Sequence, residues 1–326
     1  MESFKEAIVI GAGNWGRPIA GLLSGNVPVR LWTIDQREAE SLNARYEQLW
    51  PKAKRVCEIV IEPKFASSFS EDDTLIVMAV PSSQIPSVAE ELARHTTRPT
   101  ILSVSKGFDI DWFCTPSGMI IRQIPRAMVV CLTGPTIANE VAVGMPTTAV
   151  LSSDHLAALA RIKEGLRNDV INFEVARNPR QHEVCAALKG IVAIGVGMAD
   201  GLSLGVNFQS VVIARGIKEM VRIASFFDIP KDIVYGLSGI GDVMTTCMSH
   251  NSRNRKLGYF IGKGLKLQEA LDRVEMTVEG VAMAKTIQTL WSLDVSIPVF
   301  HFINDAIFDK KLDLRREFID VLRKFA

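Results

Sequence analysis

The hydrophobic and polar residues of this chain follow two different patterns along its length. In the first part, short apolar runs typical of buried strands alternate with helical segments such as residues 88–95. This alternation predicts an α/β fold built on a doubly wound, largely parallel sheet. The predicted strands cover residues 7–10, 29–32, 59–61, 75–80, 100–104, 128–132, 146–151 and 172–175.

After residue 177 the strand-like runs disappear and long helical periodicities replace them. The predicted helices cover residues 181–199, 208–227, 281–293 and 299–308. A chain of 326 residues is long enough for two domains with separate cores. We therefore predict an α/β domain over residues 1–177 and an all-helical domain over residues 178–326.

The first helix of the second part carries one unexpected charge. Residues 184–198 are small or apolar except for Lys189, and a helix that is apolar on all faces is a buried helix. Its glycines allow another backbone or a ligand to approach closely. The run is too short to span a bilayer and is broken by Gly190, Gly195 and Gly197. A buried ammonium must be paired or must lose its proton, which predicts a proton-exchanging role for Lys189. The alternative is that Lys189 extends to solvent from one end of the helix.

The composition narrows the classes of partner. A hydrophobic fraction of 48% fits large cores, and a formal net charge of +1 gives no ground for nucleic acid or a membrane surface as partner. The five cysteines are scattered and form no CxxC pair, which favours a reducing, cytoplasmic location. The N-terminus runs directly into a strand, so we expect no signal peptide.

The first predicted strand leads into GAGNWG, which matches G-x-G-x-x-G, and a helical stretch and a second strand follow. In this order the pattern marks a dinucleotide-binding fold of the Rossmann type. Gly11 permits the tight turn, Gly13 lets a pyrophosphate approach the backbone, and Gly16 lets helix and strand pack closely. The phosphates would lie at the helix N-terminus, where N–H groups and the helix dipole favour anions.

The end of the second predicted strand bears on the choice of coenzyme. A carboxylate at Asp35 would bind the ribose hydroxyls of NAD and repel the 2′-phosphate of NADP. Asp35 could instead cap the helix that begins near Arg37. Arg30 and Arg37 keep NADP possible.

Ligands of open sheets bind at the carboxyl ends of the strands. Lys106 follows the strand at residues 100–104 and precedes a glycine, so its side chain could point into the cofactor crevice. The alternative, which the spacing alone favours, is a solvated lysine in a turn. The segment TGPTIANE at residues 133–140 follows the next strand.

The helical part contains a second informative stretch, GLSGIGDVMTTC, followed by SRNRK. Asp242 follows three glycines and could be catalytic or simply the N-cap of a short helix. Arg253, beside Ser252 and Asn254, makes a plausible anion clamp because guanidinium matches phosphate geometry. The alternative is that this basic cluster is a solvated face.

Nine motifs now stand in one order along nearly the whole chain: GAGNWG, VPS, SKG, GPTIANE, EVCAALKG, a DG…G.N run, GLSGIGDVMTTC, SRN and TVEG. Together they resemble the NAD(P)-dependent glycerol-3-phosphate dehydrogenases of the bacterial type. The resemblance implies an N-terminal Rossmann domain and a C-terminal helical domain. It also implies interconversion of dihydroxyacetone phosphate and sn-glycerol 3-phosphate, which supplies the glycerol backbone of phospholipids.

The resemblance further implies roles for single residues. Lys189 is the general acid/base, Lys106 lies at the substrate carbonyl and the nicotinamide, and Asp242 corresponds to the aspartate of the family. We expect Lys106 and Asp242 to tune Lys189 and to orient the substrate. The residues assigned to the substrate are Lys106, Gly134, Thr136, Lys189, Asp242, Thr246, Ser252, Arg253 and Asn254. Those assigned to the cofactor, by the fingerprint or the resemblance, are Gly11, Gly13, Asn14, Trp15, Gly16, Asp35, Lys106, Ala138, Arg253 and Glu279.

Two residues depart from the family pattern. Gly190 stands where the family motif A-L-K-N has an asparagine that helps to hold the substrate. Ile34 stands where many relatives have a basic residue, which favours NAD. Gly190 motivates an alternative enzyme that acts on another small phosphorylated or carboxylated hydroxy-compound. A catalytically inactive nucleotide sensor is the alternative from a different class.

The resulting expectation is a cytoplasmic oxidoreductase that uses NAD, with NADP possible, and a small phosphorylated substrate. Lys189 would donate a proton as hydride reaches the carbonyl, and such general acid catalysis typically contributes ~10²–10⁴-fold. We expect a homodimer with no metal, no nucleic-acid partner and no membrane insertion.

Overall fold

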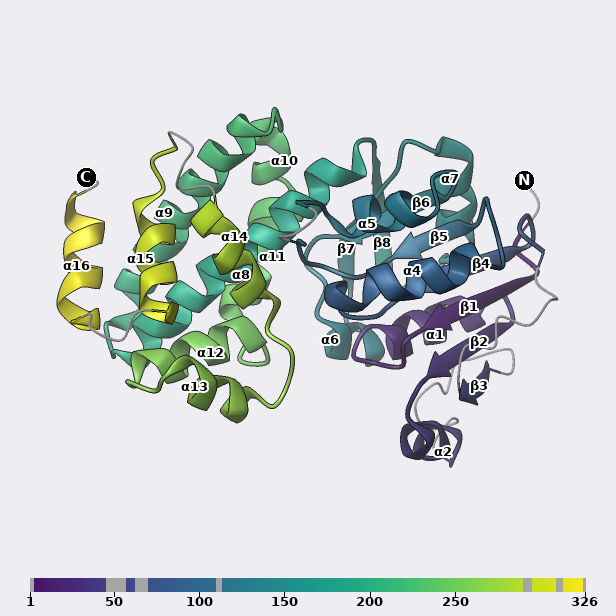
Figure 1. Cartoon of the computed structure of the whole chain (residues 1–326), viewed down its shortest axis with the longest axis horizontal. Helices are drawn as coiled ribbons and strands as arrows, with labels where there is room; N and C mark the ends of the chain where they lie inside the picture. The colour runs from purple at the N-terminus through teal and green to yellow at the C-terminus, as the bar shows by residue number, and fades with distance from the viewer. Residues whose placement is uncertain are drawn as a thin grey trace. The chain divides into compact units, whose positions relative to one another are not determined.

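The computed structural model describes residues 3–44, 57–61, 70–109, 113–289, 295–308 and 313–324. The chain divides into two compact units. The first comprises Met1–Ser105 and Cys114–Arg180, and the second comprises Lys106–Phe113 and Gln181–Ala326. The first unit holds the sheet and the second is helical, which confirms the predicted fold class (Figure 1). The assignment of cofactor binding to residues 1–177 and of catalysis to residues 178–326 stays a prediction.

The sheet has eight strands in the order β3-β2-β1-β4-β5-β6-β7-β8. Neighbouring strands are parallel except for β6 and β7, which run antiparallel. The first six follow the order of the Rossmann fold, whose switch point lies between β1 and β4. The strands are β1 (Glu6–Ile10), β2 (Val29–Thr33), β3 (Cys57–Ile61), β4 (Thr74–Met78), β5 (Thr100–Ser103), β6 (Met128–Thr133), β7 (Thr147–Ser152) and β8 (Ile171–Ala176).

Burial along the strands follows their place in the sheet. Every residue of the central strand β4, with the sequence TLIVM, is buried, as expected for a strand covered on both faces. The edge strand β8 alternates between buried and exposed residues at its start. The helices of this unit are α1 (Gly16–Ser24), α2 (Gln36–Ala44), α4 (Ile85–Ala93), α5 (Pro116–Gln123), α6 (Ala138–Ala142) and α7 (Leu156–Gly165), with a 3₁₀ turn at Ser82–Gln84.

The second unit packs helices around the long apolar helix α8 (Pro179–Gly201). The others are α9 (Gly205–Phe226), α10 (Lys231–Tyr235), α11 (Asp242–Met248), α12 (Arg253–Gly262), α13 (Leu267–Val274), α14 (Glu279–Thr289), α15 (Pro298–Phe308) and α16 (Leu314–Lys324). A π-helical turn, η2 (Leu237–Gly241), precedes α11. The helix predicted over residues 281–293 corresponds to α14, and its last four residues lie outside the described residues.

Helix α8 corrects one expectation. The apolar run was expected to be too short and too interrupted to span a bilayer, but α8 continues through its glycines for 23 residues and passes that test by length and hydropathy. However, 89% of its most apolar window is buried inside the protein. Helix α8 therefore has the burial of a core helix.

The glycines of α8 admit another backbone, as the sequence suggested. A Cβ atom at Gly197 would lie 2.0 Å from the carbonyl oxygen of Arg255, and one at Gly201 would lie 2.3 Å from that of Tyr259. On α12, a Cβ at Gly258 would lie 2.0 Å from the carbonyl oxygen of Ile194. Helices α8 and α12 thus touch backbone to backbone, which fixes the N-terminus of α12 relative to the helix that carries Lys189.

Candidate active site

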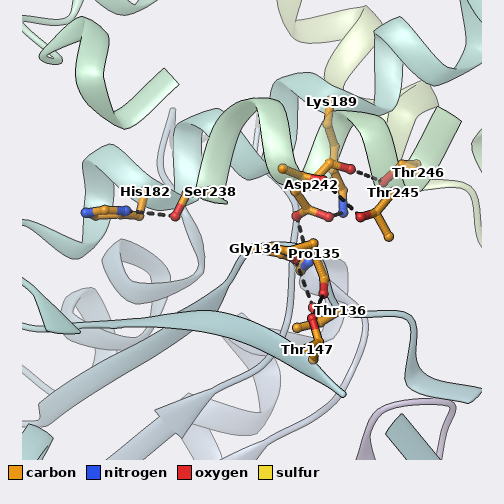
Figure 2. Close-up of polar contacts among 12 residues, drawn as sticks. Gly134, Pro135, Thr136, Thr147, His182, Lys189, Ser238, Asp242, Thr245 and Thr246 are labelled. Atoms are coloured by element: carbon orange, nitrogen blue, oxygen red, sulfur yellow. Dashed lines mark hydrogen bonds and ion pairs between the residues drawn. The ribbon is translucent and has the colours of Figure 1, made fainter. Parts of the chain in front are cut away.

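Asp242 binds two lysine side chains at once. Its Oδ2 accepts a hydrogen bond from Nζ of Lys106 at 2.7 Å, and its Oδ1 accepts one from Nζ of Lys189. The Asp242 side chain is 2% exposed, and those of Lys106 and Lys189 are 15% and 13% exposed. Figure 2 shows Lys189 reaching Asp242 from the neighbouring helix. The second unit therefore contains a buried triad of one carboxylate and two amines.

Burial changes the proton affinity of this triad. The pKa of Lys189 is lowered from its usual value to about 8, first by burial and also by the positive charge of Lys106. The carboxylate of Asp242 acts in the opposite direction and raises this pKa. An amine with a pKa of about 8 can both give and take a proton near neutral pH, as a general acid/base requires.

The simpler alternatives for these residues do not fit the structure. Lys106 is not a solvated lysine in a turn, and Lys189 does not extend to solvent, because both bind Asp242. Asp242 is the first residue of α11 rather than its N-cap, which is Gly241 and makes no side-chain capping bond. The buried Asp242 carboxylate instead accepts hydrogen bonds from the two lysine amines.

The position of Asp242 depends on the π-helical turn η2. A Cβ at Gly239 would lie 2.0 Å from the carbonyl oxygen of Val234, so only glycine allows this turn to pack where it does. Thr245 and Thr246 donate their hydroxyl hydrogens to the backbone carbonyls of Gly241 and Asp242. Such π-helical turns are rare and are frequent at functional sites.

The predicted anion clamp lies at the N-terminus of α12. Ser252 caps the helix by accepting a hydrogen bond from the backbone N–H of Arg255. Arg253 donates from Nη1 to the carbonyl of Thr277 at 2.9 Å. Arg255 instead pairs with Asp200 at 2.8 Å, so the basic cluster is not simply a solvated face.

Asn254 connects this clamp to the lysine helix. Its Oδ1 accepts a hydrogen bond from the backbone N–H of Gly280 at 3.0 Å, which leaves the Nδ2 amide as the donor group. A Cβ at Gly190 would lie 3.4 Å from that Nδ2 and 3.0 Å from Cα of Gly280. The direction of a side chain at residue 190 is therefore already filled. Gly190 therefore opens no space for a larger substrate in that direction.

The first unit contains the predicted cofactor cradle. Gly11 has a φ of +102°, which L side chains rarely adopt. A Cβ at Gly16 would lie 1.7 Å from the carbonyl oxygen of Gly11, whereas one at Gly13 would meet nothing within 4 Å. The N-cap of α1, Trp15, makes no side-chain capping bond, and the first turn has no acidic residue. Two glycines close the turn and Gly13 keeps one face open, so this loop fits a pyrophosphate at the helix N-terminus.

Asp35 is a helix cap in the structure. Its Oδ1 accepts hydrogen bonds from the backbone N–H groups of Arg37 at 2.8 Å and Glu38 at 3.2 Å, at the start of α2. The preceding residue, Ile34, is 89% exposed. Arg30 pairs with Glu6 at 2.5 Å near the amino-terminal ends of β1 and β2, and therefore at the opposite end of these strands from their carboxyl ends. Of the two arginines that kept NADP possible, only Arg37 lies near the strand end.

The remaining assigned residues occupy turns and helix starts. In the turn after β6, the hydroxyl of Thr136 donates a hydrogen bond to the carbonyl of Gly134 at 3.0 Å. The hydroxyl of Thr147 donates one to the carbonyl of Pro135 at 2.6 Å. Ala138 begins α6 in the same unit. Asn14 is exposed beside Gly13. Glu279 begins α14 in the second unit, one residue before Gly280.

One buried polar pair was not singled out from the sequence. Nδ1 of His182 on α8 lies 2.8 Å from Oγ of Ser238 in η2 (Figure 2). His182 is 8% exposed and Ser238 is 1% exposed. The available signal was the position of His182, about two helical turns before Lys189.

Comparison with known proteins agrees with this geometry. Family models described as the N-terminus and the C-terminus of NAD-dependent glycerol-3-phosphate dehydrogenase match residues 6–159 and 179–315. The chain is 32% identical over 308 residues to glycerol-3-phosphate dehydrogenase (NAD(P)+) of Agathobacter rectalis, which covers 93% of this chain and 91% of that protein. It is 34% identical over 322 residues to the enzyme of the same name from Bacillus pumilus, covering 95% and 92%.

A crystal structure of glycerol-3-phosphate dehydrogenase from Coxiella burnetii matches the fold with a TM-score of 0.86. Its sequence is 25% identical, and the match covers 98% of this chain and 99% of that one. The chain therefore belongs to the NAD-dependent glycerol-3-phosphate dehydrogenase family.

Proposed function

We propose that this protein interconverts dihydroxyacetone phosphate and sn-glycerol 3-phosphate with a nicotinamide cofactor. The observation that carries the proposal is the buried triad of Lys106, Asp242 and Lys189. The amide of Asn254 lies beside Gly190, the residue after Lys189. A carbonyl-activating amine next to a phosphate clamp suits a short phosphorylated ketone.

In this proposal Lys189 is the proton donor to the substrate carbonyl oxygen. The cofactor supplies the hydride, and the protein orients and polarises the substrate. Asp242 holds the Lys189 ammonium in place and raises its pKa, while burial first and the positive charge of Lys106 second lower that pKa to about 8. Lys189 is thus acidic enough to release its proton near neutral pH and is ready to accept it in the reverse reaction.

The phosphate of the substrate would lie at the N-terminus of α12. Ser252, Arg253 and the Asn254 amide supply donors there, and the helix dipole favours an anion. We also assign Thr246, Gly134 and Thr136 to the substrate. Binding energy from the phosphate, remote from the reacting carbon, would position the carbonyl for reaction.

NAD is the proposed cofactor, with NADP possible. Gly11, Gly13, Asn14, Trp15 and Gly16 would hold its pyrophosphate and Asp35 its ribose. The remaining proposed contacts are Lys106, Ala138, Arg253 and Glu279. We further propose a cytoplasmic homodimer in which the first unit binds the cofactor and the second carries catalysis.

The test is a substrate panel followed by absorbance at the nicotinamide band, with NADH and NADPH in parallel. Dihydroxyacetone phosphate should give the highest kcat/KM among phosphorylated and carboxylated ketones. Higher kcat/KM for another ketone would redirect the proposal to that substrate. No turnover with any ketone would favour the nucleotide sensor.

A further inference from the structure

Two polar contacts join helix α8 to the segment that carries Asp242. Lys189 binds the Asp242 carboxylate, and His182, about two helical turns earlier on α8, binds Ser238 in η2. Residues separated by two turns lie on the same face of a helix, so both contacts are made from one side of α8. Figure 2 shows both the His182–Ser238 contact and the Lys189–Asp242 contact.

The His182 contact is buried and well formed. The distance of 2.8 Å between Nδ1 and Oγ is that of a good hydrogen bond. Burial lowers the pKa of His182, so the ring is neutral at pH 7 and its Nδ1 either donates to or accepts from the hydroxyl. Loss of one partner would leave the other buried without this bond, which makes the pair costly to break.

The segment between Ser238 and Asp242 leaves these two residues little freedom to move relative to each other. It is a single π-helical turn, held against the carbonyl of Val234 at Gly239 and continuous with α11. A shift of Ser238 relative to α8 would therefore be passed to Asp242, four residues later. The Lys189–Asp242 contact would change with it.

We infer that His182 is a positioning residue for the reaction, which holds η2 through Ser238 so that Asp242 meets Lys189. The inference rests on the proposed function only for its kinetic readout. The charged groups that act on Lys189 are Asp242, which raises its pKa, and Lys106, which lowers it. A displaced Asp242 therefore predicts a lower pKa for Lys189.

The test compares His182→Leu and Ser238→Ala, which remove the bond, with His182→Asn, which keeps a hydrogen-bonding atom near the Nδ1 position. His301→Leu is the matched control, because His301 is a partly buried histidine on α15 whose pKa burial also lowers. We expect His182→Leu and Ser238→Ala each to lower kcat by about 3–10-fold, and the double variant to lose no more than either single one. His182→Asn should stay within about 2-fold of wild type, with an unchanged KM for NADH.

A second readout does not depend on turnover. Titration of the Lys189 ¹³Cε resonance in lysine-labelled protein, assigned with Lys189→Arg, reports the pKa of this amine directly. His182→Leu and Ser238→Ala should lower that pKa, while His182→Asn and His301→Leu should leave it unchanged. The same Lys189 pKa in all variants would overturn the positioning role of His182, even if the enzyme were active on another substrate. A loss of activity that follows thermal stability equally in His182→Leu and His301→Leu would overturn it as well.

Discussion

Lys106 donates a hydrogen bond to Oδ2 of Asp242 over 2.7 Å, and this leaves the other carboxylate oxygen for Lys189. One carboxylate thus holds two ammonium groups whose charges repel each other. Burial lowers the pKa of Lys189, the charge of Lys106 lowers it further, and Asp242 raises it, so that it lies at about 8. In the direction of ketone reduction the protonated amine is the active form. The rate should therefore be high below this pKa and fall as the pH rises through about 8.

The fall in rate at high pH forms the alkaline limb of the pH profile. Substitutions of Asp242 and of Lys106 should shift this limb in opposite directions. Asp242→Asn removes the charge that raises the pKa of Lys189, so the limb should shift to lower pH and kcat should fall by about 10²-fold or more. Lys106→Met removes the charge that lowers the pKa, so the limb should shift to higher pH. The measurement is kcat for ketone reduction over a pH range of about 6 to 10. Shifts of the same sign in both variants would contradict the triad.

The glycine loop of the first unit offers a matched pair of alanine substitutions. Gly13→Ala places a Cβ in open space, so stability should change little while the Kd for NADH rises by about 10-fold. Gly16→Ala places a Cβ 1.7 Å from the Gly11 carbonyl, so the protein should lose several °C of Tm, roughly the effect of 1–3 kcal/mol. Calorimetry and NADH fluorescence titration separate the two effects. Unchanged NADH affinity in Gly13→Ala would mean that the pyrophosphate does not bind at this loop.

Gly190 gives the third prediction. Its Cβ direction meets Gly280 and the Asn254 amide, so a larger residue must press on the clamp. We expect Gly190→Asn to lower kcat/KM for dihydroxyacetone phosphate by about 3–10-fold, mainly through KM. Gly190→Ala, with the same Cβ and no amide, is the control and should show most of this loss. A rise in kcat/KM for asparagine but not alanine would mean that a missing substrate contact had been restored.

Coenzyme choice provides the fourth prediction. We expect a higher kcat/KM with NADH than with NADPH, because Asp35 is acidic and Ile34 is apolar and exposed. Asp35→Ser should narrow the preference by about 3–10-fold, and Arg37→Ala should weaken use of NADPH. Arg30→Ala is the control, since Arg30 pairs with Glu6 and should leave the preference unchanged. A wild-type preference for NADPH would show that the end of β2 had been misinterpreted.

The features that could be predicted from the sequence depend on short stretches of chain. The glycine loop was visible because strand, turn and helix follow one another within one motif. Lys189 stood out because it is the one charge in an apolar run. For Lys106, spacing favoured a solvated turn, because its partner Asp242 lies 136 residues away in sequence.

The features that were missed depend on contacts between distant segments. The His182–Ser238 bond joins residues 56 positions apart, and neither residue matches a motif that would reveal the other. The filled space beside Gly190 depends on Gly280, whose approach is set by the packing of α14. The substitution was visible from sequence, but whether it opened or closed space required the fold.

The central claim is that Lys189 is the proton donor, and Lys189→Ala tests it most directly. We measure kcat for reduction of dihydroxyacetone phosphate together with the Kd for NADH, with the exposed Lys218→Ala on α9 as control. The account predicts that kcat falls by about 10²–10⁴-fold in Lys189→Ala, with Kd near the wild-type value and the control unchanged. A Lys189→Ala enzyme that retains more than about a tenth of the wild-type kcat would contradict the claim.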